Sequence, residues 1–104
     1  MRKHELCKQT LLATDTGTMQ AFGNSMLPVL QSGVTLTYAR QEAYKSGDIV
    51  FCKVRGRYID AHYITKIEGG RYMIANKAGK ENGWADAVFG RVVKAMYQGK
   101  ESTF

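Results

Sequence analysis

The chain has 104 residues, of which 44 % are hydrophobic and 23 % are charged, a balance typical of one globular domain. Its 11 glycines and single proline favour short strands joined by tight turns over a helical bundle. The net charge of +6 permits an acidic partner, but the basic residues are scattered and no helix-turn-helix or zinc-finger pattern is visible. Composition therefore disfavours nucleic-acid binding, which stays the third of three functions considered.

Cofactor, metal and membrane functions find no support in the residue patterns. The two cysteines, Cys7 and Cys52, are far apart and form no CxxC motif, so we expect neither a zinc site nor a disulfide framework. Cys52 lies in an apolar run and is expected to be a small buried side chain. No apolar stretch reaches the length of a signal sequence or a bilayer span. These observations predict a cytoplasmic protein with no cofactor, no metal and no membrane anchor.

The predicted elements, in chain order, begin with a helix over residues 3–13, where Leu6, Leu11 and Leu12 form a partial apolar stripe. Apolar runs bounded by glycine turns then predict six strands, at 18–23, 34–39, 49–54, 58–68, 71–76 and 88–97, with a loop at 77–83. We therefore expect one mostly β domain over residues 1–104, a small barrel or sandwich. Residues 1–17 are its helix and linker, and residues 18–97 are its β core.

The stretch FGNSMLPVLQSG, Phe22 to Gly33, holds the only proline and a serine between an asparagine and a methionine. Gly23 permits an unusual backbone geometry just before Ser25, while Pro28 fixes its own φ and favours an extended Leu27. Two interpretations are compatible with these residues. Ser25 is either the N-cap of a short helical turn, where serine is favoured, or a nucleophile at the tip of a rigid turn.

A nucleophilic serine needs a base that accepts its proton, and His62 is the first candidate because histidine titrates near neutrality. A lone strand histidine can also pack or face solvent without any chemistry. Lys66, four residues further on, is the alternative base if burial lowers its pKa, and His4 is a weaker candidate. Asp60, on the same strand face, and Asp86, in a loop, are the carboxylates considered for orienting the imidazole.

Four stretches follow one another along the chain: GNSMLPVLQSG, SGDIVFCKV, IDAHYITKI and ANKAGKENGWADAVFGRVV. Their order resembles the boxes of the serine peptidase superfamily that contains signal peptidase I and the LexA-type repressors. The first is similar to its nucleophile box G-x-S-M-x-P, the second to a Gly-Asp followed by an apolar strand, and the third to the strand of the general base. The fourth looks like a drifted last box, and the resemblance covers about residues 20 to 95.

The resemblance implies a LexA-like or signal-peptidase-like fold and a role for several residues. Ser25 matches the nucleophile, with its backbone N–H as a plausible oxyanion donor. His62 falls where the bacterial members carry a lysine, similar to the archaeal and endoplasmic-reticulum signal peptidases. Asp86 falls near the aspartate of the last box, although Asn76 is not followed by the expected loop. Met26 and Pro28, from the nucleophile box, are predicted to contact substrate.

The residues before the first box are too few for the DNA-binding domain of a LexA-type repressor, so the resemblance implies a stand-alone core of phage or prophage type. Its first predicted function is a serine endopeptidase that cleaves an extended peptide or protein substrate with a Ser-His pair. A non-catalytic module for protein binding or homodimerisation is the alternative. Binding of nucleic acid through the net positive charge is the third.

Overall fold

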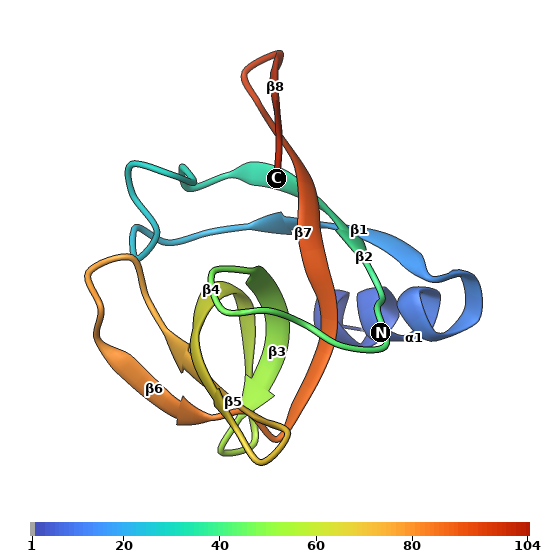
Figure 1. The fold of residues 1–104 in the computed structure, drawn as a ribbon. Coiled ribbons are helices and arrows are strands. Elements are labelled where there is room, and N and C mark those ends of the chain that lie inside the picture. Colours follow the sequence, from blue (N-terminus) through green and yellow to red (C-terminus); the bar gives the residue numbers. More distant parts are fainter. Residues whose placement is uncertain (1) are drawn as a thin grey trace.

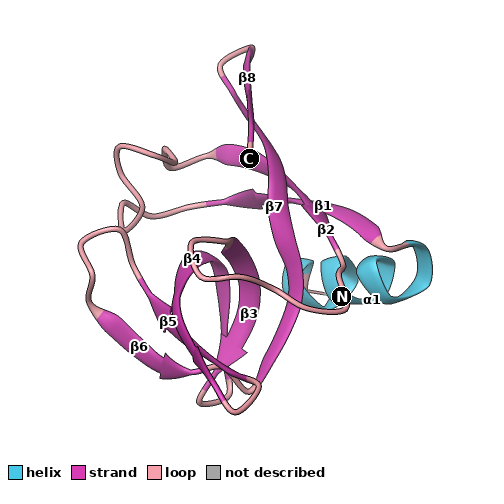
Figure 2. Ribbon diagram, viewed as in Figure 1, coloured by secondary structure: helices cyan, strands magenta, loops and turns pink. Residues whose placement is uncertain are grey.

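The computed structural model describes residues 2–104, in which one helix precedes a set of antiparallel strands (Figures 1 and 2). The elements are α1 (Lys3–Thr14), β1 (Thr16–Ala21), β2 (Val34–Ala39), β3 (Ile49–Val54), β4 (Arg57–Glu68), β5 (Arg71–Ala75), β6 (Glu81–Trp84), β7 (Ala87–Tyr97) and β8 (Lys100–Thr103). The prediction of a mostly β protein with a short N-terminal helix is confirmed.

The strands form one coiled sheet in the order β1-β2-β7-β3-β4-β5-β6, and β8 pairs with β7 outside this path. The long strand β7 joins two parts of the sheet. Its first half, Ala87–Arg91, pairs with β3, and its second half, Arg91–Met96, pairs with β2. Figure 1 shows β7 running from the coil of β3, β4, β5 and β6 to the β1–β2 pair. This arrangement places the end of β1 opposite the middle of β4.

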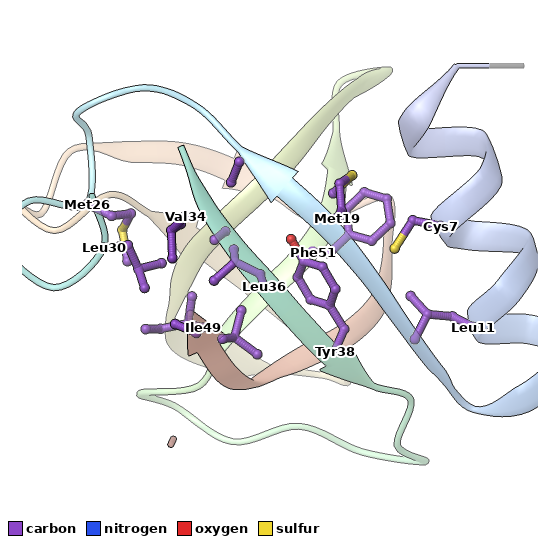
Figure 3. Packing of buried hydrophobic residues seen from close by; sticks show 14 residues of the cluster. Cys7, Leu11, Met19, Met26, Leu30, Val34, Leu36, Tyr38, Ile49 and Phe51 are labelled. Atoms are coloured by element: carbon purple, nitrogen blue, oxygen red, sulfur yellow. The ribbon is translucent and has the colours of Figure 1, made fainter. Parts of the chain in front are cut away.

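Two hydrophobic clusters fill the interior, and β3 separates them. Phe51 points from β3 into a cluster with Leu11, Leu36 and Tyr38, which extends from α1 along β1 and β2 to Met26 and Leu30 (Figure 3). Val50, Cys52 and Val54 point the other way, into a second cluster with Tyr44, Ile64 and Ile74. Because both faces of β3 are covered, its sequence reads as a continuous apolar run instead of an alternation.

Helix α1 docks on this sheet through fewer apolar residues than expected. Its buried side chains are Cys7 and Leu11, whereas Leu6 and Leu12 are 57 % and 55 % exposed. A Cβ on Gly17 of β1 would lie 3.2 Å from Leu11 Cγ, so the missing side chain permits the close approach of helix and strand. The predicted stripe through Leu6, Leu11 and Leu12 is therefore wrong at two of its three positions.

Three strand predictions need correction. The first strand is Thr16–Ala21 instead of 18–23, because Gly17, Met19 and Ala21 face inward and Phe22, 64 % exposed, lies beyond its end. Strand β6, Glu81–Trp84, overlaps the end of the loop predicted at 77–83, and β8 lies beyond the predicted core. Neither short strand alternates between buried and exposed residues, so neither has the pattern on which a strand prediction rests.

The helix and the two thiols bear on membrane and redox functions. No helix among residues 2–104 is long and apolar enough to span a bilayer. Cys7 and Cys52 are both buried free thiols, and burial raises their pKa values to about 11 and about 12. Both thiols therefore stay protonated at neutral pH and are unsuited to nucleophilic attack.

Candidate active site

Ser25 lies in the loop that joins β1 and β2, and two kinds of contact shape this loop. Backbone hydrogen bonds close it: the N–H of Gly33 donates to the carbonyl of Ala21 at 2.7 Å, and the N–H of Leu30 donates to that of Met26 at 3.0 Å. The side chains of Met26 and Leu30, each 4 % exposed, anchor it in the first hydrophobic cluster. Ser25 directly precedes the first of these anchors and is exposed.

A second loop supports the first one from outside. The N–H of Lys77, between β5 and β6, donates a hydrogen bond of 3.1 Å to the carbonyl oxygen of Ser25. That second loop is itself closed by Asn76, whose side-chain oxygen accepts a hydrogen bond from the N–H of Lys80 at 2.9 Å. The backbone at Ser25 is thus held by Lys77, which is 52 residues away in the sequence.

The hydroxyl of Ser25 lies beside the imidazole of His62 on β4. Ser25 Oγ and His62 Nε2 are 2.9 Å apart, and His62 Nδ1 is 2.7 Å from Oδ1 of Asn82 on β6. An amide oxygen can only accept a hydrogen bond, so Nδ1 carries the ring proton and donates it to Asn82. The lone pair of Nε2 is then free to accept the hydroxyl proton of Ser25. The N-cap interpretation of Ser25 is not the one observed, because its hydroxyl contacts the side chain of His62 on β4.

Burial governs the protonation of His62. Desolvation lowers its pKa, while the hydrogen bond to Asn82 and the negative charge of Asp60 act in the opposite direction and only partly offset it. The net shift is downward from the ordinary value of about 6.5. His62 is consequently neutral at pH 7, which is the form in which it can accept a proton from Ser25.

One carboxylate and one base predicted from the sequence, Asp86 and Lys66, lie away from the Ser25–His62 pair. The carboxylate of Asp86 accepts a hydrogen bond from the N–H of Gly56 at 2.9 Å, in the turn between β3 and β4. Asn82 takes the place beside His62 that was predicted for Asp86, so that prediction is corrected. Lys66 is also not brought to Ser25, because a bulge after Ile64 interrupts the alternation of β4. The Lys66 ammonium instead lies 5.6 Å from the ring centre of Trp84.

The Ser25–His62 pair opens into a cleft of about 300 Å³ between β1, β4 and the Ser25 loop. The cleft is lined by His4, Ala21, Phe22, Gly23, Ser25, Met26, Leu30, Gln31, Val34, Tyr58, Ile59, Asp60, Ala61 and His62. Met26 thus lines the cleft, and its contact with a substrate stays a prediction. Pro28 does not line the cleft and lies on a separate hollow beside Tyr97 and Lys100.

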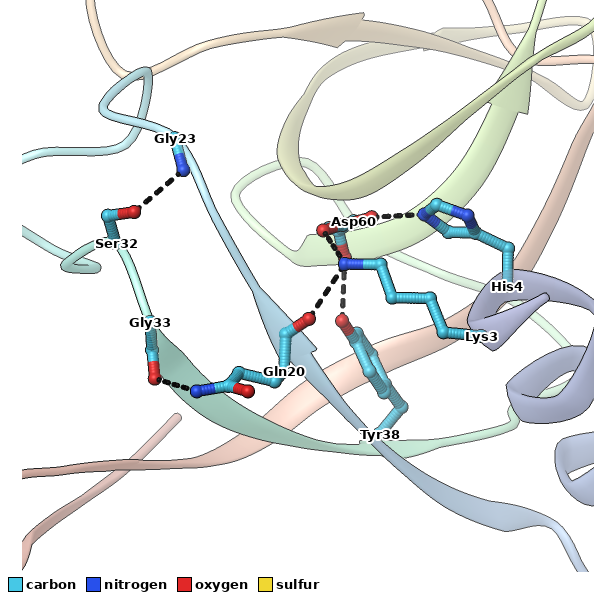
Figure 4. A network of polar contacts seen from close by, with 8 residues as sticks. All are labelled: Lys3, His4, Gln20, Gly23, Ser32, Gly33, Tyr38 and Asp60. Atoms are coloured by element: carbon cyan, nitrogen blue, oxygen red, sulfur yellow. Dashed lines mark hydrogen bonds and ion pairs between the residues drawn. The ribbon is translucent and has the colours of Figure 1, made fainter.

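Asp60 lies in the same cleft, two residues before His62, and binds the first turn of α1 (Figure 4). Its Oδ1 is hydrogen-bonded to His4 Nε2, and its Oδ2 is 3.1 Å from Lys3 Nζ. The hydroxyl of Tyr38 donates to its main-chain carbonyl at 2.8 Å. Asp60 therefore does not orient His62 by contact and acts on it through its charge alone. His4, the weaker candidate base, is bound to this carboxylate and is not placed at Ser25.

Sequence reasoning missed Asn82. The search for an orienting group considered carboxylates, whereas an amide oxygen makes the same hydrogen bond without a charge. The stretch Glu81–Trp84 also contains a glycine and was assigned to a loop, which left Asn82 without a defined position. No local signal points to Asn82, because it is the residue skipped where the register of β5 and β6 shifts, and that register is set by tertiary pairing.

No group of three metal-binding side chains comes together within residues 2–104. A scan against models of known protein families and a search of curated proteins both found no match to this chain. The geometry of the site therefore carries what is inferred about its chemistry.

Proposed function

We propose that the protein is a serine endopeptidase of the superfamily that contains signal peptidase I and the LexA-type repressors. The observation that carries the proposal is the 2.9 Å contact between Ser25 Oγ and His62 Nε2. A serine, a base within hydrogen-bond distance and a third group that orients the base are the parts of an activated nucleophile. Asn82 is the third group here, and its contact of 2.7 Å fixes the tautomer of His62.

In this proposal, Ser25 Oγ attacks the carbonyl carbon of a peptide bond while His62 Nε2 takes the hydroxyl proton. The tetrahedral intermediate collapses when the imidazolium returns that proton to the leaving amine, which leaves an acyl group on Ser25. Water, activated by His62, then hydrolyses the ester. The charge of Asp60 favours the transient imidazolium, and the backbone N–H of Ser25 is the proposed oxyanion donor.

The shape of the cleft supports a peptide as the substrate. β1 is at one end of the strand order, and its last residues line the cleft opposite Ala61 of β4. An extended peptide can lie between the two strands and place a carbonyl at Ser25. The apolar side chains of Met26, Val34 and Ala61 near the serine favour an uncharged side chain there.

The test is labelling by a fluorophosphonate, which reacts with activated serines, followed by identification of the modified residue. We expect the label on Ser25 and none in Ser25→Ala, since an unactivated hydroxyl reacts far more slowly. Ser32→Ala is a matched control, because Ser32 lies in the same loop and its Oγ accepts a hydrogen bond from Gly23 at 3.0 Å. Equal labelling of wild type and Ser25→Ala would contradict the proposal.

A peptide-binding module without catalysis is the second candidate, and the neutral amide of Asn82 is the observation that favours it. An amide stabilises an imidazolium less than a carboxylate does, so the transition state gains less. The two functions are separated by incubating wild type and Ser25→Ala with a peptide mixture. Cleavage by wild type alone supports the peptidase, whereas equal capture of uncleaved peptides by both proteins supports the module.

A cytoplasmic location and a homodimer stay predictions from the sequence. Cell fractionation tests the first, and sedimentation of the purified chain over a range of concentrations tests the second. Neither result bears on the chemistry of Ser25.

A further inference from the structure

Asp60 is the one carboxylate among the described residues that line the cleft. Its side chain is 19 % exposed, so it is largely removed from water and yet reachable from the cleft. A carboxylate in such a position interacts strongly with any cation that enters, because water screens the attraction less than at an open surface. The cleft thus has one site of negative charge among apolar and neutral side chains.

The position of Asp60 relative to the reacting pair defines which part of a peptide it would meet. Asp60 and His62 are two residues apart on β4, which is about 7 Å along an extended strand, with both side chains in the cleft. A peptide aligned with β4 has the same spacing, so its side chain two positions from the one at the Ser25–His62 pair faces Asp60.

In the free protein, Lys3 already binds Asp60 in a way that resembles a bound peptide. Its Nζ lies 3.1 Å from Asp60 Oδ2 and 2.8 Å from the main-chain carbonyl of Gln20 on β1 (Figure 4). The ammonium therefore bridges β1 and β4 at the edge of the cleft, in a neighbouring hollow that shares Phe22 with the cleft. It fills one main-chain acceptor of β1 and one side-chain acceptor of β4, which are the groups that a cationic peptide would use.

The hold of Lys3 on these acceptors is weak enough to be exchanged. Its side chain is 41 % exposed, and ion pairs at such exposed positions contribute little to stability. Lys3 is also the first residue of α1, where the helix dipole disfavours a cation. Its remaining neighbour, the ring of Phe22 with its centre 5.2 Å away, is itself 64 % exposed. His4 is stacked on Tyr58 with ring centres 5.0 Å apart, which keeps it beside Asp60.

We propose that Asp60 selects a basic side chain, lysine or arginine, in the peptide that the cleft binds, and that Lys3 occupies this place while the cleft is empty. The inference rests on the proposed function in so far as the bound peptide is also the substrate. Overall charge has the opposite effect, because a chain with net charge +6 attracts acidic peptides at long range. A preference for basic peptides therefore reports the local carboxylate.

The test is digestion of a peptide library prepared from a whole proteome, with the cleaved bonds identified by mass spectrometry. We expect lysine and arginine to be enriched about tenfold two positions from the residue at the scissile bond, which is the size of one charge-assisted hydrogen bond. Asp60→Asn, which keeps the shape and loses the charge, should reduce this enrichment to below about twofold. Lys3→Met should increase it, because the competing ammonium is removed. Lys8→Met is the control, since Lys8 lies over Phe89 outside the cleft and should leave the enrichment unchanged.

Cleavage with no enrichment of basic residues, or enrichment unchanged in Asp60→Asn, overturns the inference while the peptidase stands. If the wild-type protein cleaves nothing, the proposal of a peptidase is wrong. The preference of Asp60 for a basic side chain is then tested by peptide binding. The probes are then two acetylated tetrapeptide amides, Ala-Lys-Ala-Ala and its norleucine analogue, titrated into Ser25→Ala by NMR. Tighter binding of the lysine peptide, lost in the double variant with Asp60→Asn, supports the inference. Equal affinity, or no binding of either peptide at millimolar concentration, overturns it.

Discussion

Two histidines line the same cleft, and the difference between them shows what makes an imidazole a base. Each forms a hydrogen bond from one ring nitrogen to a side-chain oxygen. The partner of His62 is the neutral amide of Asn82 at its Nδ1, which leaves Nε2 for Ser25. The partner of His4 is the carboxylate of Asp60 at its Nε2, and within residues 2–104 no serine, threonine or cysteine side chain is hydrogen-bonded to this ring. Both rings have a hydrogen-bond partner, so the partner does not distinguish them. The difference is that the second nitrogen of His62 faces the hydroxyl of Ser25.

Their supports differ as well. His62 lies in the middle of β4, where it pairs with Val50 of β3 and directly precedes Tyr63, the first residue of β4 that pairs with β5. His4 lies in the first turn of α1, and its ring is held by stacking on Tyr58. The central strand is the better place for a residue whose nitrogen must stay within hydrogen-bond distance of a hydroxyl.

The largest expected effect comes from removing each imidazole in turn. His62→Ala should lower kcat/KM for peptide cleavage by about 10³-fold, because proton transfer from Ser25 is lost. His4→Phe keeps the stacking on Tyr58 and should lower it less than about fivefold. Steady-state rates on one cleaved peptide check both values. A larger loss in His4→Phe than in His62→Ala would reverse the assignment of the two rings.

A smaller effect is expected from the partner of the catalytic ring. Asn82→Ala should lower kcat by about 10- to 100-fold, because the tautomer and orientation of His62 are no longer fixed. KM should change little if Asn82 acts only through His62. Asn82→Asp should recover most of the rate, since a carboxylate accepts the same hydrogen bond. Failure of both variants to affect kcat would show that the contact with Asn82 is structural.

The pH dependence sharpens the comparison further. Because burial lowers the pKa of His62, kcat/KM should be at its plateau at pH 7 and fall with a midpoint below about 6.5. The unfolded chain binds the His62 proton more readily than the folded one in that window. His62 therefore contributes stability above about pH 6.5 that is lost as pH falls toward its folded pKa. Asn82→Asp should move the kinetic midpoint upward, and a pH–rate profile of both proteins measures the change.

The smallest effect is predicted for the contact that docks the helix of His4. Gly17→Ala places a Cβ 3.2 Å from Leu11 Cγ and 3.3 Å from Cys7 Sγ, so α1 must shift. We expect a loss of about 1 kcal/mol in the free energy of unfolding, as for mild overpacking of a core. Urea denaturation measures this loss. Labelling of Ser25 should persist in the variant, because β4 and the Ser25 loop do not touch Gly17. Loss of this labelling would show that α1 positions the site.

The strands that sequence reasoning placed correctly have a property in common. At Val34–Ala39 the side chains alternate, and at Ile49–Val54 they are apolar throughout, so the burial of each strand is visible in its residues. β6 and β8 are short edge elements whose pairing depends on neighbouring strands. Their order is imposed by tertiary contact, to which local propensity contributes little.

The site shows the same division. Local patterns, a turn with Gly23 and Pro28 and an apolar strand, made Ser25 and His62 candidates but left other interpretations open. The order of the four stretches, which resembles the peptidase boxes, favoured the pair as nucleophile and base. Their contact, and the choice of Asn82 over Asp86, depends on how the sheet coils and on which residue of β6 faces β4. A bulge after Ile64 then removed Lys66 from the face that simple alternation gives it. Register is a long-range property, and a count of residues along one strand cannot supply it.

The hydrogen bond from the N–H of Lys77 to the carbonyl of Ser25 has a consequence for how such a site can evolve. Both of its atoms belong to the main chain, so it constrains the path of the backbone and leaves the side chain at position 77 free to vary. Any residue except proline can donate this bond. The segment that supports Ser25 can therefore diverge in sequence while it keeps its shape.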